Sequence, residues 1–297
     1  MSRQWLVIVN PLSGGNRNRG RLAAMLAGLQ PPAHTIVMTR YPGHAAELAM
    51  AAQAHGGVAS VGGDGTLFEI LRGVDRKQQR IALIPAGRGN SLARDLGLLN
   101  GGGPLAAMHW EQTRFIDLLE VTVTRADGAV STHLSASTVA VGYPAAVVLL
   151  ARKLARLGRM SYAAAATVAA TRPVHFGACV QYGDGIPRDV RLSGFIANNT
   201  QHLANFVVFR KASYCDGMFE VMEMDAGVVK QTMHNVSALS GTGVYEPYPH
   251  TQATRARLWL EAPQTLMLDG ELFPDVASLD VRILPSALEC NGPKARA

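Results

Sequence analysis

Residues 58–69 read VASVGGDGTLFE, in which a short apolar run passes through three glycines into a helical pattern. Glycine tolerates positive φ and lets a ligand approach the backbone closely. A glycine turn that leads into a helix directs N–H groups at an anion, with the helix dipole behind them. Asp64 would repel a bare polyphosphate here, so it indicates a metal ion or an acceptor for a hydroxyl proton. The stretch predicts a strand, a phosphate-binding loop and a helix, in that order.

Two common nucleotide-binding fingerprints are missing from the sequence. No Gly-x-x-x-x-Gly-Lys-Ser/Thr run occurs, which excludes a P-loop. The run 87–89 (GRG) begins like a dinucleotide fingerprint, but Leu92 stands where the third glycine belongs. The structural alternative is a tight turn in which Thr66 and Glu69 form a capping box. Capping does not explain Asp64, so a functional loop is favoured.

Apolar runs and helical patterns alternate four times in the first part of the chain. The predicted strands are Trp5–Val9, His34–Thr39, Val58–Val61 and Arg80–Ile84. The predicted helices end near Leu26, cover Ala45–Ala54, follow Thr66 and cover Leu92–Leu96. This alternation indicates a parallel sheet covered by helices, which binds ligands at the carboxyl ends of its strands. The loops 10–16, 40–44, 62–66 and 85–91 leave that edge of the sheet.

Beyond glycines 101–103 the sequence changes to short apolar runs separated by Gly, Pro and Asp. Strands are predicted at Arg114–Thr124, Thr132–Val141, Val174–Tyr182, Val190–Ala197, Ala204–Phe209, Phe219–Met224, Ala253–Glu261, Thr265–Leu268 and Leu279–Leu284. Helices are predicted over Ala145–Thr171 and Val228–Leu239. Many short strands joined by such turns indicate an antiparallel sandwich.

Charge and cysteine content indicate which classes of partner and which cellular compartment to expect. A net charge of +6 and a pI of about 9.5 favour anionic partners such as a nucleotide or an anionic membrane surface. No basic run is interleaved with aromatic residues, so nucleic acid is not an expected partner. The three cysteines show no pair spacing, which fits a reducing cytoplasm. The apolar stretch Ala136–Ala151 is shorter than the ~20 residues of a membrane-spanning helix.

Two carboxylates in the later sequence are candidates for chemistry. Asp117 lies in the apolar run FIDLL, where a buried carboxylate is costly without a partner. Glu271 follows Asp269 and Gly270, and an ordinary Asp-Gly hairpin turn explains that placement equally well.

The loop 62–66 (GGDGT), followed by LFE, resembles the nucleotide-binding loop of the diacylglycerol kinase, sphingosine kinase and NAD kinase superfamily. The loops 10–15 (NPLSGG) and 85–90 (PAGRGN) resemble further elements of its lipid kinases, whereas NAD kinases match only the central motif well. The resemblance implies an α/β domain over residues 1–124, to which 285–297 return. It also implies a mainly antiparallel β-sandwich over 125–284 that binds the lipid, with the nucleotide in the interdomain cleft.

The same resemblance implies an ATP-dependent lipid kinase that uses Mg²⁺ and transfers the γ-phosphate to the hydroxyl of diacylglycerol or of a sphingoid or related lipid. It implies that Asp64 and Glu271 are the catalytic residues, either of which could accept the hydroxyl proton. Asp117 and Asp216 are expected near the metal. The residues expected to bind the nucleotide are Asn10, Ser13, Gly14, Thr39, Gly62, Gly63, Gly65, Thr66, Gly87, Gly89 and Asn90.

Two positions depart from the family pattern, in opposite directions. Ser91 follows Asn90 where many bacterial lipid kinases have Asp, which weakens a diacylglycerol assignment. Residues 142–145 (GYPA) carry no charge where sphingosine kinases have an Asp for the substrate amine. The alternatives are an NAD kinase-like enzyme with a soluble substrate and a non-catalytic protein that binds nucleotide or lipid.

A lipid kinase without a spanning segment is expected to act at the membrane surface, as a peripheral cytoplasmic protein. In the stretch 149–160, Leu150, Leu154 and Leu157 fall on one helical face. The basic residues around that face are Arg152, Lys153, Arg156 and Arg159. This composition is typical of an interfacial helix, and the alternative is a helix packed on the second domain with a solvated basic face. A homodimer stays open as a further partner.

Overall fold

A computed structural model of the chain describes residues 4–14, 22, 26–28, 34–99, 110, 112–154, 161–171, 175–203, 206–207, 209–225 and 248–291. The chain divides into two compact units. The first contains residues 1–118 and 285–297, and the second contains residues 119–284.

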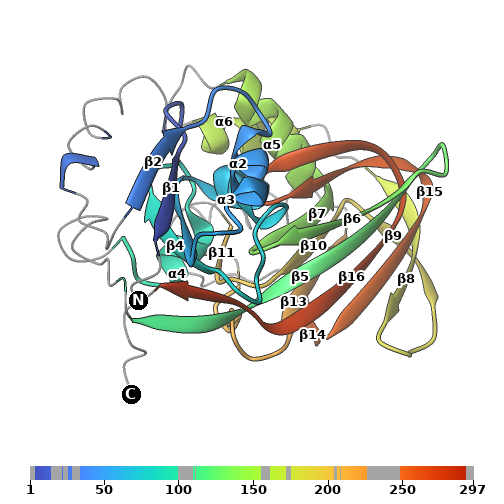
Figure 1. The fold of residues 1–297 in the computed structure, drawn as a ribbon. Coiled ribbons are helices and arrows are strands. Elements are labelled where there is room, and N and C mark those ends of the chain that lie inside the picture. The colour runs from blue at the N-terminus through green and yellow to red at the C-terminus, as the bar shows by residue number, and fades with distance from the viewer. Residues whose placement is uncertain are drawn as a thin grey trace. The chain divides into compact units, whose positions relative to one another are not determined.

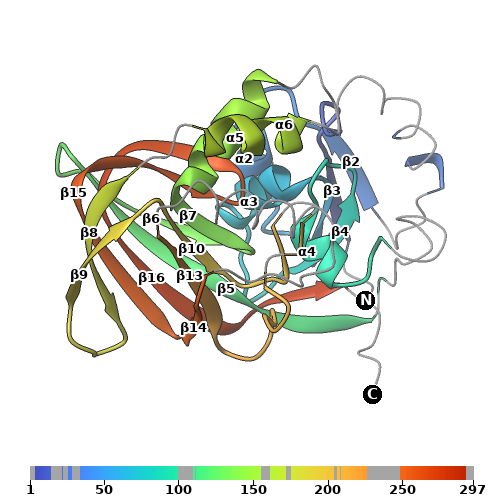
Figure 2. The same ribbon diagram turned by 180° about the vertical axis from the view of Figure 1, so that it is seen from behind.

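The first unit is built on a parallel sheet. Its strands are β1 (Trp5–Val9), β2 (His34–Met38), β3 (Gly57–Gly62) and β4 (Arg80–Pro85), in the order β2-β1-β3-β4. Strands β1 and β3 are buried along their whole length, as their continuous apolar runs require. Helices α2 (His44–Ala51) and α3 (Asp64–Leu71) pack on β1 and β3, and α4 (Ser91–Asp95) packs on β4 (Figures 1 and 2).

The end of the chain adds to this sheet. The last part of β16 (Glu271–Asn291) pairs with β4 in parallel, with Cys290 opposite Ile81. The side-chain Oδ1 of Asn291 accepts a hydrogen bond of 2.8 Å from the backbone N–H of Leu83. Residues 285–291 therefore extend the parallel sheet of the first unit.

The second unit is largely antiparallel. Its strands run in the order β14-β13-β10-β7-β15-β16, with β8 paired with β15, β9 paired with β8 and β6 paired with β5. Their bounds are β5 Thr113–Arg125, β6 Val130–Ser135, β7 Thr138–Gly142, β8 Phe176–Tyr182, β9 Arg188–Leu192, β10 Gly194–Asn198, β13 Phe219–Met224, β14 His250–Ala253 and β15 Arg255–Leu268. A short pair, β11 (His202–Leu203) and β12 (Phe206–Val207), stands apart. Helices α5 (Tyr143–Lys153) and α6 (Ser161–Ala170) lie side by side (Figure 1).

The predicted fold class is confirmed: a parallel α/β part is followed by a largely antiparallel β part. Several element bounds differ from the sequence prediction. The run Thr132–Val141 is two strands rather than one, because the backbone N–H groups of residues 136–138 turn toward the Asp269 carboxylate. The runs 253–261 and 265–268 form one strand, β15, whose pairing with β16 shifts register between Trp259 and Leu266.

Two predicted segments fall largely or wholly on residues that the structure does not describe. The helix expected over Val228–Leu239 lies outside the described residues, as does most of the helix expected to end near Leu26. The single helix expected over Ala145–Thr171 contains α5 and α6, and residues 155–160 between them are not described.

Helix α5 presents a different face to solvent from the one that the sequence predicted. Leu150 packs against a buried cluster that includes Val148, Ile196 and Met222, so it belongs to the core. The exposed side chains near the end of α5 are Leu149, Arg152 and Lys153. Leu157, Arg156 and Arg159 lie outside the described residues. No helix in the described part of the chain is long and apolar enough to cross a membrane.

Candidate active site

The loop after β3 opens helix α3 earlier than the capping-box pattern predicts. The helix begins at Asp64 with Gly63 as its N-cap, and no side chain caps it. Thr66 Oγ1 instead accepts a hydrogen bond of 3.0 Å from Asn10 Nδ2, and Glu69 Oε2 accepts one of 3.2 Å from the Ala45 N–H. The capping box is therefore wrong. Thr66 and Glu69 tie α3 to neighbouring segments, and the start of the helix has no side-chain acceptor of its own.

Asp64 is the first residue of α3 rather than a loop residue, and its carboxylate reaches the next strand-loop-helix unit. Its Oδ1 accepts a hydrogen bond of 2.9 Å from the backbone N–H of Ser91, the first residue of α4. A carboxylate at a helix N-terminus is favourable because the helix dipole is positive there. The bond fixes the side chain on which the phosphate-loop hypothesis depends.

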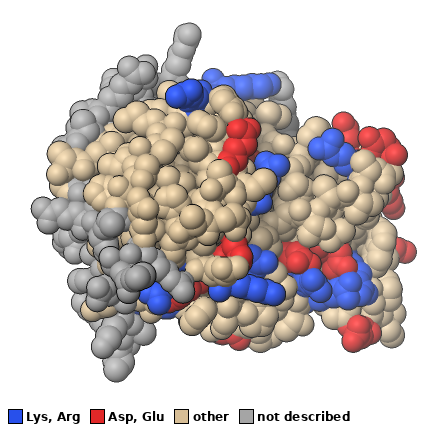
Figure 3. Space-filling view, viewed as in Figure 1, with Lys and Arg blue, Asp and Glu red and all other residues tan. Residues whose placement is uncertain are grey.

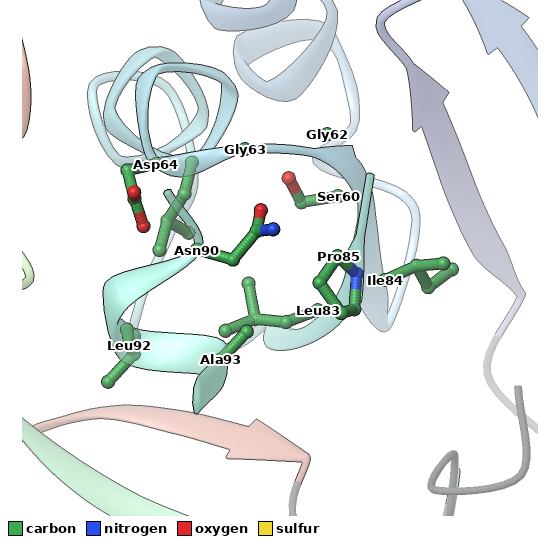
Figure 4. A pocket seen from close by; sticks show the side chains of 11 residues that line it. Ser60, Gly62, Gly63, Asp64, Leu83, Ile84, Pro85, Asn90, Leu92 and Ala93 are labelled. Carbon is green, nitrogen blue, oxygen red and sulfur yellow. The ribbon is translucent and has the colours of Figure 1, made fainter. Parts of the chain in front are cut away.

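The segment 87–90 is held in shape by Asn90. The backbone of Asn90 is left-handed, with φ of 57°, and its side chain closes a ring with Gly87. Asn90 Oδ1 accepts from the Gly87 N–H at 3.1 Å, and Nδ2 donates to the Gly87 carbonyl at 2.8 Å. Asparagine is among the residues that tolerate this backbone conformation and can hydrogen-bond locally. Figure 4 shows the Asn90 amide pointing toward the backbone at Gly62 and Gly63.

The two glycine loops approach each other so closely that side chains are excluded. A Cβ at Gly87 would lie 2.4 Å from the Cα of Gly63, and a Cβ at Gly63 would lie 3.0 Å from the Cα of Gly87. The glycines at these positions are therefore required by backbone contact, not only by turn geometry. Gly62 also joins the two loops, because its carbonyl accepts hydrogen bonds from the N–H groups of Ala86 and Gly87.

A small cavity of about 20 Å³ lies where the two loops meet. It is lined by Ser60, Gly62, Gly63, Asp64, Leu67, Leu83, Ile84, Pro85, Asn90, Leu92 and Ala93 (Figure 4). It holds a water-sized group, whereas ligand pockets span roughly 300–1,000 Å³. The cavity marks the junction of the loops, and a nucleotide would have to lie over them rather than inside it.

The remaining residues assigned to the nucleotide lie at strand ends in the same unit. Asn10 follows β1, and its backbone N–H donates to the Val61 carbonyl at 3.0 Å, which places it beside the end of β3. The Thr39 N–H donates to the Val9 carbonyl at 2.8 Å. Ser13 and Gly14 follow Asn10 in a turn, in which Gly14 has φ of 76°. The structure thus brings Asn10 to Thr66 and the two glycine loops to each other.

The two carboxylates expected near a metal, Asp117 and Asp216, each accept a hydrogen bond from a backbone N–H group. Asp117 is almost fully buried in β5, and its Oδ1 accepts a hydrogen bond of 2.7 Å from the Ser286 N–H. Asp216 Oδ1 accepts one of 3.1 Å from the Met218 N–H, within an exposed turn. Among the described residues, no three His, Cys, Asp or Glu side chains gather as a metal site. A metal role for Asp117 and Asp216 stays a prediction.

The comparison with family models finds a match in the first part of the chain. Residues 4–121, which contain both glycine loops, match the diacylglycerol kinase catalytic domain. The match extends from the start of β1 into β5. The comparison with curated proteins gives no match.

Solved structures of diacylglycerol kinases share the fold of the whole chain. A structure of a protein from Bacillus anthracis str. Sterne, described as a proposed diacylglycerol kinase, has a TM-score of 0.78 at 20% identity and covers 99% of this chain and 97% of its own. Another, titled as a diacylglycerol kinase from the same organism, has a TM-score of 0.75 at 19% identity, with 99% and 98% covered. An NAD kinase from Archaeoglobus fulgidus in complex with ATP has a TM-score of 0.50 at 15% identity, with 94% and 90% covered.

The residues of the first unit fit the ATP that this kinase family uses. Helix α3 starts without a side-chain cap, and the positive end of its dipole suits an anion. Mg²⁺ is usually held by one or two carboxylates together with substrate phosphates. Asp64, in the first turn of α3, is a carboxylate that could take part in such a site.

Glu271 belongs to the second unit and lies at a hairpin turn, as the structural alternative predicted. Leu268 pairs with Glu271, and the two residues between them, Asp269 and Gly270, have φ of 49° and 93°. Positive φ at both central residues is the mark of a type I′ turn, for which Asp-Gly is favoured. The hairpin is confirmed, and a catalytic or nucleotide-binding role for Glu271 stays a prediction.

Asp269 is the residue at this turn that sequence reasoning missed. Its buried carboxylate accepts hydrogen bonds from the Ser135 hydroxyl and from the backbone N–H groups of Ala136, Ser137 and Thr138, at 2.8 to 3.0 Å. Burial raises the pKa of the Asp269 carboxyl, and these bonds oppose the rise. The Asp-Gly pair signals a turn, but nothing local in the sequence signals the partner segment more than a hundred residues earlier.

Proposed function

We propose that this protein is an ATP-dependent lipid kinase that transfers the γ-phosphate to the hydroxyl of diacylglycerol or of a sphingoid or related lipid. The observation that carries this proposal is the backbone contact between Gly63 and Gly87, with Asp64 bonded to Ser91 beside it. These loops lie in the segment that matches the kinase family. Glycine-lined backbone at a helix start suits a phosphate, and an acidic side chain among the glycines suits transfer of that phosphate to a hydroxyl.

In this mechanism the chain positions the reactants and performs little covalent chemistry. The first turn of α3 receives the phosphates, and Asp64 or Glu271 accepts the proton of the attacking hydroxyl. Mg²⁺, when bound, neutralises charge on the transferring phosphoryl group. The hydrogen bond from the Ser91 N–H to one oxygen of Asp64 orients the carboxylate.

The lipid would be reached at the membrane surface. The side chains of α5 that support this are the exposed Leu149 and Lys153, which replace the leucine face expected from the sequence. An exposed leucine beside a lysine suits an anionic leaflet, to which each basic residue adds about 1 kcal/mol of attraction. Ser91 and residues 142–145 depart from the family pattern in opposite directions, so both diacylglycerol and sphingoid lipids stay open as the substrate.

Phosphate transfer to lipid is tested by incubating the protein with γ-labelled ATP, Mg²⁺ and a lipid extract. Label that enters the organic phase identifies a lipid kinase, and chromatography of the product identifies the lipid. Asp64→Asn, run in parallel, should leave the label in the aqueous phase. No transfer by the wild-type chain to any lipid of the extract would overturn the proposal.

A soluble substrate is the second candidate, favoured by the fold shared with an NAD kinase. The same incubation with NAD in place of lipid separates the two, since the label would then enter a phosphorylated dinucleotide. ATP binding without label in either product would instead favour a non-catalytic binding protein.

A further inference from the structure

One guanidinium nitrogen contacts two consecutive residues of the β15–β16 hairpin. Arg152 Nη2 donates to the Gly270 carbonyl at 2.8 Å and to Glu271 Oε2 at 2.9 Å. The first bond goes to the backbone of the turn and the second to the side chain that follows it. The pair therefore sets the direction of the Glu271 carboxylate relative to its own backbone.

Each side of this contact is fixed by the core of the second unit. Helix α5 carries Arg152 in its last turn and is anchored through buried Val148 and Ala151. The turn is anchored through Asp269, which accepts its four hydrogen bonds from residues 135–138. A contact between two anchored elements holds a side chain in one place, which a contact between two mobile groups does not.

Stability is a poor explanation for this ion pair. The side chains of Arg152 and Glu271 are 50% and 44% exposed, and ion pairs in such surroundings add little to folding. Glu271, by contrast, has several rotatable bonds, and an oriented carboxylate is what proton transfer or phosphate contact requires. The contact between Arg152 and the hairpin is therefore suited to orienting the Glu271 carboxylate.

We propose that Arg152 is a positioning residue that holds the Glu271 carboxylate in its working direction. This inference rests on the proposed function, because Glu271 needs a working direction only if it takes part in binding or transfer. It also changes the reading of Arg152, whose charge the sequence assigned to the membrane surface. The Glu271 carboxylate and the turn carbonyl both bind one nitrogen of that guanidinium, Nη2.

The test compares Arg152→Gln and Arg152→Lys with Arg191→Gln, a matched control that removes an exposed arginine on β9 of the same unit. Arg152→Gln should lower kcat about tenfold with a smaller change in the KM for lipid, because a misplaced group costs rate. Arg152→Lys, which keeps the charge and a nitrogen with several hydrogens, should recover most of the loss. Arg191→Gln should keep the wild-type kcat.

A double-mutant cycle with Glu271→Gln separates positioning from a general structural effect. In the Glu271→Gln background, Arg152→Gln should change kcat less than twofold, because the carboxylate that Arg152 orients is already absent. Equal factors in both backgrounds would overturn the proposal. Wild-type kinetics for Arg152→Gln in an active enzyme would overturn it as well.

A readout without catalysis keeps this inference distinct from the proposed function. Hydrogen exchange at residues 269–271 should become faster in Arg152→Gln than in the wild type or in Arg191→Gln, since one anchor of the turn is lost. Unchanged exchange there would overturn the positioning role, whatever the activity. A wild-type chain that transfers no phosphate, or a Glu271→Gln variant with full activity, would instead overturn the assigned function of Glu271.

Discussion

The carboxylate of Asp64, at the start of α3, accepts a hydrogen bond from the backbone N–H of Ser91, at the start of α4, over 2.9 Å. Two helix N-termini that follow neighbouring strands are thereby joined through one acidic side chain. The bond gives Asp64 a structural role that the sequence did not show. It also orients the side chain for the catalytic role proposed for it, so the two roles must be separated by the choice of substitution.

Asp64→Asn should abolish phosphoryl transfer while the protein keeps its wild-type Tm within about 2 °C. The asparagine Oδ1 still accepts the Ser91 N–H, whereas the negative charge is lost. Asp64→Ala should abolish transfer and also cost about 1 kcal/mol of stability, as the loss of a helix cap does. Kinetics and thermal unfolding of both variants are the measurements. Turnover near the wild-type rate in Asp64→Asn would remove Asp64 from the chemistry.

Gly87→Ala should separate the two glycine loops. The new Cβ would lie 2.4 Å from the Cα of Gly63, and the backbone must move to avoid it. We expect a loss of about 1–3 kcal/mol in unfolding free energy, typical of overpacking, together with weaker ATP binding. Gly63→Ala is the graded comparison, because its closest contact is 3.0 Å and should cost less. Denaturant unfolding and calorimetry with ATP measure both effects, and equal costs would show that the contact is not what requires glycine.

The parallel strands were predictable from sequence because burial on both faces leaves a continuous apolar signal. The run Trp5–Val9 was predicted to the residue, and β3 and β4 to within one residue at either end. Predictions failed where a distant side chain takes over local backbone groups. Residues 136–138 read as the middle of one strand, but the Asp269 carboxylate accepts hydrogen bonds from their N–H groups, and the strand ends there.

The candidate site was predictable in its glycine loops and not in its supporting contacts. Glycines in a strand-loop-helix pattern mark a close backbone approach wherever the loops meet. The ion pair of Arg152 with Glu271 joins residues 119 positions apart, and the Asp64–Ser91 bond spans 27 positions. No local pattern encodes such pairs, so the sequence assigned Arg152 to a membrane surface and Thr66 to a cap.

The stability of the second unit should depend on pH through Asp280. Bonds from Arg255, opposed in part by burial, lower the pKa of the Asp280 carboxyl below its ordinary value of 3.8, and Arg257 lowers it further. The bonded, charged form is favoured by folding, so its contribution is complete above about pH 4 and is lost as the pH falls through the lower folded value. Asp280→Asn should cost about 1 kcal/mol at pH 7, since the pair is partly exposed.

The difference between wild type and Asp280→Asn should shrink as the pH is lowered from 4 to 2. Urea unfolding at a series of pH values measures it. Asp127→Asn, at an exposed turn of the same unit, reports the effect of removing one negative charge elsewhere. Figure 3 shows acidic and basic side chains adjoining on the face it presents, so a general charge effect needs this control. A difference that stays constant down to pH 2 would show that the charge of Asp280 adds no stability.

Contact with an anionic membrane should depend on Leu149 and Lys153, which are exposed near the end of α5. The double variant Leu149→Gln, Lys153→Glu should weaken binding to anionic vesicles on the order of tenfold, because it removes an apolar insertion and reverses one charge. Arg152 is left unchanged, since it bonds to Glu271 and its substitution would alter activity directly. Vesicle sedimentation and turnover of vesicle lipid are the measurements.

Val168→Gln is the matched control for this surface, because Val168 is an exposed apolar residue on the neighbouring helix α6, which has no basic residue in its last turn. It should bind vesicles as the wild type does. Turnover of a short-chain soluble lipid should be the same in the wild type, the double variant and the control, since this lipid needs no surface. If the double variant binds vesicles with wild-type affinity, α5 does not contact the membrane, and the second unit must meet its substrate through another face.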